Sequence, residues 1–324
     1  MAGSKSLTTI FVKAETTAGT YSTPAAASDA IAIRVANLAI SIDQSFANRD
    51  VITSGFNATD KLSSYRRAKI TFSVELGASG TAGTAPKWGV CSKAAGQSET
   101  VTATTRVEYA PISALMGTVS LIGVYDGIQF AARYASCNQK MSMKVNDIGS
   151  IDFEFTGLVN SVTAGALAGA VFANQARAQA VGPANTTGMS LGAVTYAAGA
   201  ITGGTAYGME SFNFDTGLDI QDVALTGGLE TIGIYGREPK VDFTIDLPSA
   251  AKVALIADMD AGTTRAFGLV HGTVAGNKVG FYAPALVIEK VDTVDSGSVL
   301  LTKISGTLRP SASGLNDEHK IWTF

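Results

Sequence analysis

Apolar and polar residues alternate along several stretches of the chain. The clearest stretch is residues 69–76 (KITFSVEL), where every second residue is apolar. Similar alternation recurs at residues 31–35, 38–42, 151–157, 211–215, 241–247 and 279–283. A period of two is typical of half-buried antiparallel strands, and glycine-rich turns separate the runs. The sequence therefore predicts a mainly β fold.

Two segments break this alternation and predict short helices. The first spans residues 84–96, with Thr84 as a plausible N-cap, Pro86 in the first turn and Gly96 at the end. In such a helix Trp88, Cys91 and Ala95 would face the sheet. The second segment starts at Pro248 and closes at Gly262.

A similar strand precedes each of these two segments. Residues 66–76 read RRAKITFSVEL and residues 237–247 read REPKVDFTIDL, with four identical positions. The shared order of strand and helix indicates an internal duplication. We therefore expect a first module at residues 1–165, an Ala/Gly-rich connector at 166–205 with one or two weak strands, and a second module at 206–324.

Composition argues against most enzymes and against nucleic-acid reading. The 24 Lys and Arg are outnumbered by 27 Asp and Glu, which gives a net charge of −3 and no basic footprint. Two histidines and two cysteines have no metal-ligand spacing, and the glycine-rich residues 77–83 lack the phosphate-loop pattern. We expect no catalytic residues, no cofactor and no metal.

Only 16% of the residues are charged, against about 25% in typical proteins. Such a surface suggests that much of the subunit is covered in an assembly. The first residues carry no signal-peptide pattern, and the longest apolar run, at residues 164–173, is too short for a membrane span. We expect free thiols, no membrane partner and no secretion by the usual route.

Several of these segments resemble a known family. Residues 75–89 (ELGASGTAGTAPKWG), 151–158 (IDFEFTGL), 212–218 (FNFDTGL) and 261–269 (AGTTRAFGL) are similar to segments of the tail tube proteins, or major tail proteins, of long-tailed bacteriophages. The resemblance spans residues 28–310 or so. It implies modules built as a β-sandwich or barrel, each with a short flanking helix.

The resemblance also implies a structural role without catalysis. Tube modules join edge to edge into rings of six, and the rings stack into the channel through which DNA leaves the capsid. Two modules in one chain would make a ring of three subunits with pseudo-sixfold symmetry. Implied partners are other copies of the chain, a tape measure protein, and tail terminator and tail tip proteins, while DNA passes without specific binding. The location would be the virion tail, after assembly in the host cytoplasm.

Two long polar segments, residues 43–64 and 215–235, occupy equivalent places in the two copies. We expect both to be loops that contact neighbouring rings. The candidates for ring-stacking or intersubunit contacts are Arg49, Asp50, Lys61, Tyr65, Arg66, Arg67, Asp219, Asp222, Glu230, Tyr235 and Arg237. For the basic cluster at residues 66–69, the alternative is a charged strand edge that discourages aggregation.

Three alternatives remain open. The tube subunit could form rings of six chains, with the second half as an outer decoration domain. The chain could be another virion component, such as a tail terminator, although those are usually single modules. It could instead be a carbohydrate-binding β-sandwich, which would display a row of exposed aromatic residues, yet Trp88 and Trp322 are the only tryptophans.

Overall fold

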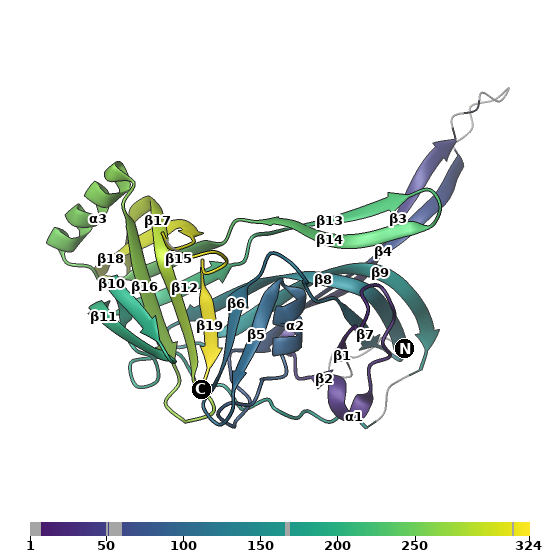
Figure 1. Cartoon of the computed structure of the whole chain (residues 1–324), viewed down its shortest axis with the longest axis horizontal. Helices are drawn as coiled ribbons and strands as arrows, with labels where there is room; N and C mark the ends of the chain where they lie inside the picture. Colours follow the sequence, from purple (N-terminus) through teal and green to yellow (C-terminus); the bar gives the residue numbers. More distant parts are fainter. Residues whose placement is uncertain (1–7, 50, 52–59, 166–168, 313) are drawn as a thin grey trace.

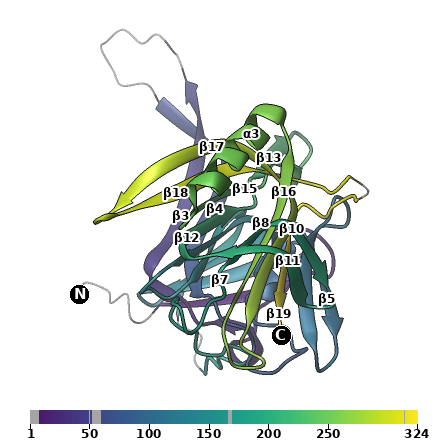
Figure 2. The ribbon, with the colours of Figure 1, turned by 90° about the vertical axis from the view of Figure 1, so that its left-hand side faces the viewer.

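The computed structural model describes residues 8–49, 51, 60–165, 169–312 and 314–324. Antiparallel strands form most of it, which confirms the predicted mainly β class. The molecule is elongated, with the first half at one end, the second half at the other, and two long hairpins above them (Figure 1). Figure 2 views the same ribbon from the end formed by the second half.

The first half holds nine strands and two short helices in its described residues. In chain order these are β1 (Thr9–Ala14), α1 (Ala26–Asp29), β2 (Ala30–Ile31), β3 (Arg34–Arg49), β4 (Asp60–Glu75), α2 (Gly89–Ala94), β5 (Gln97–Thr102), β6 (Arg106–Pro111), β7 (Val119–Tyr125), β8 (Ile128–Lys144) and β9 (Ser150–Ala164).

The rest of the described chain holds ten strands and one longer helix. These are β10 (Met189–Ala197), β11 (Ala200–Tyr207), β12 (Met209–Asp215), β13 (Leu218–Leu225), β14 (Leu229–Arg237), β15 (Lys240–Ile245), α3 (Ser249–Ala261), β16 (Thr264–His271), β17 (Val279–Ser296), β18 (Val299–Arg309) and β19 (Lys320–Thr323). The strand expected near residues 188–196 is β10, and it pairs with β16 of the second half.

The same order of paired strands occurs twice. In the first half, β3 pairs with β4, β4 with β9 and β9 with β8. In the second half, β12 pairs with β15, β15 with β18 and β18 with β17. The two sets are joined where β8 pairs with β12, from Lys140 opposite Asp215 to Lys144 opposite Ser211. The sheet therefore runs without a break from one half into the other.

A second connection between the halves comes from β19. This strand pairs with β17 on one side and with β6 of the first half on the other, where Ile321 lies opposite Tyr109. Trp322 is fully buried beside Gly280, and its Nε1 donates a hydrogen bond to Gly199 O at 3.1 Å. Segments from three parts of the chain thus meet at β19.

Aromatic side chains fill the core of each half. Phe72 of β4 stacks on Phe155 of β9, with ring centroids 5.7 Å apart. In the second half, Phe243 of β15 packs on Phe267 of β16 at 5.4 Å. All four side chains are buried, so the alternation seen in the sequence does mark the faces that turn inward.

The two segments expected to be long loops are β-hairpins, so that expectation was wrong. The described part of residues 43–64 continues β3 and β4, with Asn48 opposite Lys61. Residues 215–235 form most of β13 and β14, a separate two-stranded hairpin that lies beside β3 and β4 (Figure 1). The described outer part of the β3–β4 hairpin projects from the body and is held extended by backbone hydrogen bonds. The β13–β14 hairpin lies against the first half, where Ile232 is buried at 2% exposed.

The predictions of the two helices differ in accuracy. Helix α3 ends as predicted, with Gly262 in the left-handed conformation at φ 65°. Helix α2 covers only Gly89–Ala94, since residues 84–86 are not helical, residues 87–88 form a turn and Thr84 does not cap the helix. Trp88, Cys91 and Ala95 are buried, as expected.

Candidate assembly surfaces

Two strands, β3 and β17, lie at opposite ends of the joined strands, and each leaves an edge of the sheet open. Among the strands that the structure describes, β3 pairs with β4 alone. Strand β17 pairs with β16 only as far as Val287, so its residues 290–296 have β18 as their one described partner. Unpaired edges expose rows of backbone donors and acceptors that readily add another strand.

Apolar side chains at these two edges are only partly covered. Leu38 and Ile40 of β3, and Val291 of β17, are half-buried at the margin of the core. At the β8–β12 junction, Phe214, which is the counterpart of Ile40, and the facing Met141 are 2% and 1% exposed. The open edges therefore resemble the internal junction before its second strand has been added.

The hairpin of β13 and β14 is held on the first half by an ionic contact. Arg67 Nε of β4 donates to Asp222 Oδ2 of β13 at 2.8 Å, and Arg67 Nη1 lies 3.6 Å from Glu230 Oε2 of β14. The Arg67 guanidinium also lies 4.5 Å from the ring centroid of Tyr65. The Arg67 side chain is only 6% exposed, so this contact lies under the hairpin.

Arg237 makes a second contact of this kind at the other end of β14. Its Nε donates to Glu318 Oε1 at 3.0 Å, and its Nη1 donates to Ile112 O at 2.7 Å. Both charged side chains are largely buried, at 16% and 11% exposed. Arg237 therefore joins the hairpin to the first half and to the segment before β19.

The other residues selected from the sequence are scattered. Arg49 and Asp60 lie 3.9 Å apart near the far end of the β3–β4 hairpin, both exposed. Lys61 and Arg66 are exposed on β4, and Asp219 and Tyr235 are exposed on β13 and β14. Asp50 lies outside the described residues. The structure thus brings together Arg67, Asp222, Glu230 and Tyr65, and separates the rest.

Sequence reasoning missed the two open edges. The alternation at residues 38–42 signals a strand but not its neighbours. The second half of β17 has a weaker strand pattern, because charged residues interrupt its apolar positions from Glu289 onward. Only the pairing of strands shows which edges remain free.

Both histidines are buried, and burial favours their neutral form. Burial, together with the nearby Arg237 guanidinium, lowers the pKa of His319 to about 3. Burial also lowers the pKa of His271, whose Nδ1 and Nε2 lie 2.9 Å from Thr186 Oγ1 and 3.1 Å from Gln179 O. No group of three or more His, Cys, Asp or Glu in the described residues is placed to hold a metal ion.

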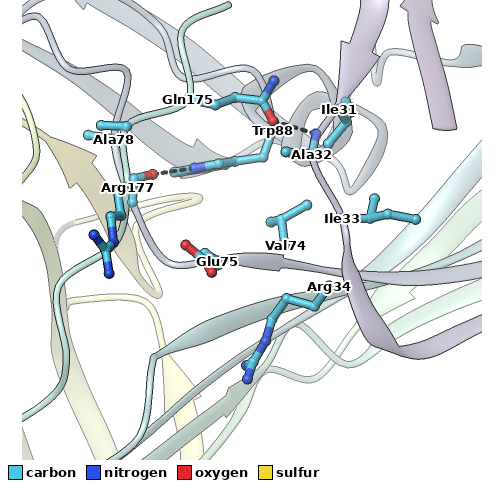
Figure 3. A pocket seen from close by; sticks show the side chains of 12 residues that line it. Ile31, Ala32, Ile33, Arg34, Val74, Glu75, Ala78, Trp88, Gln175 and Arg177 are labelled. Atoms are coloured by element: carbon cyan, nitrogen blue, oxygen red, sulfur yellow. Dashed lines mark hydrogen bonds between the residues drawn. The ribbon is translucent and has the colours of Figure 1, made fainter. Parts of the chain in front are cut away.

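A hollow marks where the connector crosses the first half. This cavity of about 520 Å³ lies between residues 31–34, the end of β4 and residues 175–177 (Figure 3). The indole of Trp88 forms one wall, and its Nε1 donates to Gly77 O at 2.7 Å. Gln175 accepts from Ala32 N at 2.6 Å and donates to Ala30 O at 3.2 Å. The side-chain amide of Gln175 thus holds the connector to the first half.

In the part of the chain that the structure covers, no helix combines the length and the apolar character required to cross a membrane. Both tryptophans are buried, Trp88 at 3% and Trp322 at 0% exposed. Neither can therefore join an exposed aromatic row of the kind that the carbohydrate-binding alternative requires.

An all-β chain with two open sheet edges and partly covered apolar residues along them is typical of structural proteins that assemble with their own kind. The family model described as phage tail tube protein matches residues 5–307. The chain belongs to this family, which makes it a structural component of the virion tail that assembles into a tube. No curated protein matches the chain.

Proposed function

We propose that three copies of this chain close into a ring with pseudo-sixfold symmetry. The observation that carries the proposal is the paired strand order that occurs twice, joined at β8 and β12. On this proposal residues 1–165 and 206–324 are tandem modules. The intervening residues 166–205 form a connector that contributes β10 and most of β11 to the second module.

Stacked rings would form the tube through which DNA leaves the capsid. A subunit enclosed by neighbours needs few surface charges, in agreement with the 16% of charged residues. The net charge of −3 favours repulsion of phosphate over retention, as a conduit requires. We further propose a tape measure protein and terminator and tip proteins as partners, assembly in the host cytoplasm, and no catalytic activity.

The two hairpins are the proposed contacts between rings. Arg49 and Lys61 near the far end of the β3–β4 hairpin, and Asp219 and Tyr235 on the other hairpin, are exposed and available to a neighbouring ring. Arg67, Asp222 and Glu230 would serve indirectly, because their contacts within the chain hold the second hairpin in place. Stacking of the rings would then depend on the exposed residues, and the position of the β13–β14 hairpin would depend on Arg67, Asp222 and Glu230.

Electron microscopy of the purified protein tests this function. Top views showing three chains around six similar lobes are the expected result. Rings of six chains would keep the tube role but overturn the trimer, and would make the second half an outer domain. A protein that stays monomeric at high concentration would overturn the tube role.

A second measurement addresses stacking. Tubes of the double variant Arg49→Glu and Lys61→Glu should be shorter than those of the unaltered chain, while single rings persist. Lys13→Glu on β1 is the matched control, because its exposed side chain lies on a strand that belongs to neither hairpin and pairs with β2 and β7. Equal shortening in both variants would remove the assigned role of the β3–β4 hairpin.

A further inference from the structure

We infer that neighbouring copies join by pairing β3 of one copy with residues 290–296 of β17 of the next, in the register of the internal β8–β12 junction. This inference rests on the proposed function and specifies its ring contact. It names the partner as a second copy of this chain, and it places Ser41 opposite Asp292.

The equivalence of strands follows from the two matching ladders. Phe72 of β4 lies opposite Phe153 of β9, and Phe243 of β15 lies opposite Ile304 of β18. Phe72 and Phe243 occupy the same position in the repeated segments 66–76 and 237–247. Strand β15 is therefore the counterpart of β4, and β18 is the counterpart of β9.

The same alignment extends to the outer strands. The residues of β8 and β17 that face Phe153 and Ile304 occupy equivalent positions. Lys140 and Asp292 directly follow these residues in the sequence, so they are counterparts. Ser41 of β3 and Asp215 of β12 are counterparts, because they face Lys69 and Lys240, which align in the repeat. Inside the chain, Lys140 lies opposite Asp215.

Transferring that pairing to the open edges gives the register between copies. Asp292 replaces Lys140, and Ser41 replaces Asp215, so these two residues face each other. Ile40 then lies opposite Thr293, as Phe214 lies opposite Met141 within the chain. Ala39 lies opposite Val294, as Asn213 lies opposite Ser142. One joint of this kind on each side of the chain closes a ring.

Burial supports this register. Ile40 and Val291 are only partly covered at the margin of the core, and pairing would make them diagonal neighbours on the inward face. The burial of Ile40 and Val291 would then approach that of Phe214 and Met141 at the internal junction. Covering apolar surface is favourable by about 25 cal/mol per Å².

Charge supports the same register. Continuing the ladder by two residues places Asp43 of one copy opposite Lys290 of the next. Both side chains are exposed, at 53% and 68%, and both lie on the outward face with Ser41 and Asp292. A similar pair of opposite charges spans the internal junction, where Lys140 Nζ lies 3.8 Å from Asp215 Oδ2.

Disulfide cross-linking of assembled rings tests the register. Residues directly opposite in an antiparallel pair have Cα atoms about 4.5–5.5 Å apart, within the range of about 4.4–6.8 Å that disulfides need. The double variant S41C/D292C, oxidised after assembly, should give a covalent species of three chains. Cys91 and Cys137 are buried, so they do not compete.

Two matched variants make the test specific. S41C/V294C keeps both thiols on the outward face but shifts the register by two residues, to a diagonal separation of about 7–8 Å, and should cross-link several-fold less. K140C/D215C places the pair at the internal junction, so it should oxidise within one chain and show that the conditions suffice. Both edge variants must first form rings under reducing conditions.

The outcomes separate this inference from the function on which it rests. Preferential cross-linking of S41C/D292C supports the register. Rings without that cross-link, or with stronger cross-linking of S41C/V294C, overturn the register but leave the tube role intact. Absence of rings in the unaltered chain would overturn the proposed function itself. Covalent species of six chains would keep the register and overturn the trimer.

Discussion

Arg67 of β4 and Asp222 of β13 are joined by a 2.8 Å hydrogen-bonded ion pair across 155 residues of sequence. The pair fixes one hairpin on the strand from which the other hairpin extends. Glu230 of β14 contributes a second carboxylate, with its Oε2 atom 3.6 Å from Arg67 Nη1. Both strands of the β13–β14 hairpin are thus held by one buried guanidinium.

Removing Asp222 should loosen this hairpin. Loss of one partner of a buried ion pair costs about 3–5 kcal/mol, but the Asp222 side chain is 38% exposed and Glu230 remains. We expect Asp222→Asn to lower the free energy of unfolding by about 1–2 kcal/mol and to speed amide hydrogen exchange in residues 218–237. Urea unfolding and exchange measured by mass spectrometry are the readouts.

The matched control for this prediction is Arg66→Ala, because Arg66 is exposed next to Arg67. Exposed substitutions usually change stability by less than about 0.5 kcal/mol. Equal effects of the two variants, or unchanged exchange in the hairpin of Asp222→Asn, would show that the ion pair does not hold it.

A methyl group at Gly280 should disturb the packing of β19. An added Cβ at this position would overlap with Cζ2 of the Trp322 ring. We expect Gly280→Ala to destabilise the protein by about 1–3 kcal/mol, as overpacking does, and to shift the tryptophan fluorescence. Gly182→Ala is the control, because nothing lies within 4 Å of a Cβ there. Similar unfolding midpoints for the two variants would contradict the packing argument.

Acidification should destabilise the fold through His319. Its pKa is lowered from 6.5 to about 3 in the folded chain, first by burial and then by Arg237, so between these values the unfolded chain binds the extra proton. The stability from His319 is therefore complete above pH 6.5 and is lost as pH falls towards about 3. One such group gives a slope of up to about 1.4 kcal/mol per pH unit.

Urea unfolding from pH 6.5 to 5 measures this slope before most carboxylates titrate. His319→Gln is less stable at neutral pH, so the slope rather than the stability is compared. We expect a shallower slope in the variant. An identical slope would show that His319 is protonated equally in both states.

The two thiols should be unreactive until the protein unfolds. Burial raises the pKa of Cys91 and of Cys137 well above the ordinary value, and the Cys137 Sγ donates to Cys91 O at 3.3 Å. Only the thiolate attacks a disulfide reagent. We expect no labelling by Ellman's reagent in the folded state and two labelled thiols in urea. Rapid labelling of the native protein would indicate local opening around α2.

The sequence predicted the strands of the core better than those outside it. Alternation at residues 69–76 and 241–247 located β4 and β15, because one face of each packs on phenylalanine rings. Most side chains of the outer β3–β4 hairpin and of the β13–β14 hairpin are exposed or half-buried, so alternation is weak there and both were interpreted as loops. The sequence predicted their position in the chain but not their conformation.

The sequence also did not predict contacts between residues that are far apart in the chain. Arg66 and Arg67 are adjacent and chemically identical, yet one is exposed and the other is buried under β13 and β14. The difference depends on where the second hairpin lies, which no local pattern reports. The pairing of β19 with β6 was invisible for the same reason.

The position of β19 has a consequence for the time course of folding. Tyr109 of β6 is synthesised roughly 210 residues before its partner Ile321, and non-local pairing of this kind slows folding. During translation the nascent first half carries two unsatisfied edges, one on β6 and one on β8, that only later segments can cover. Unpaired edges on an incomplete chain invite association with the wrong molecule. The interval before β19 and β12 arrive is thus when this polypeptide depends most on protection by chaperones.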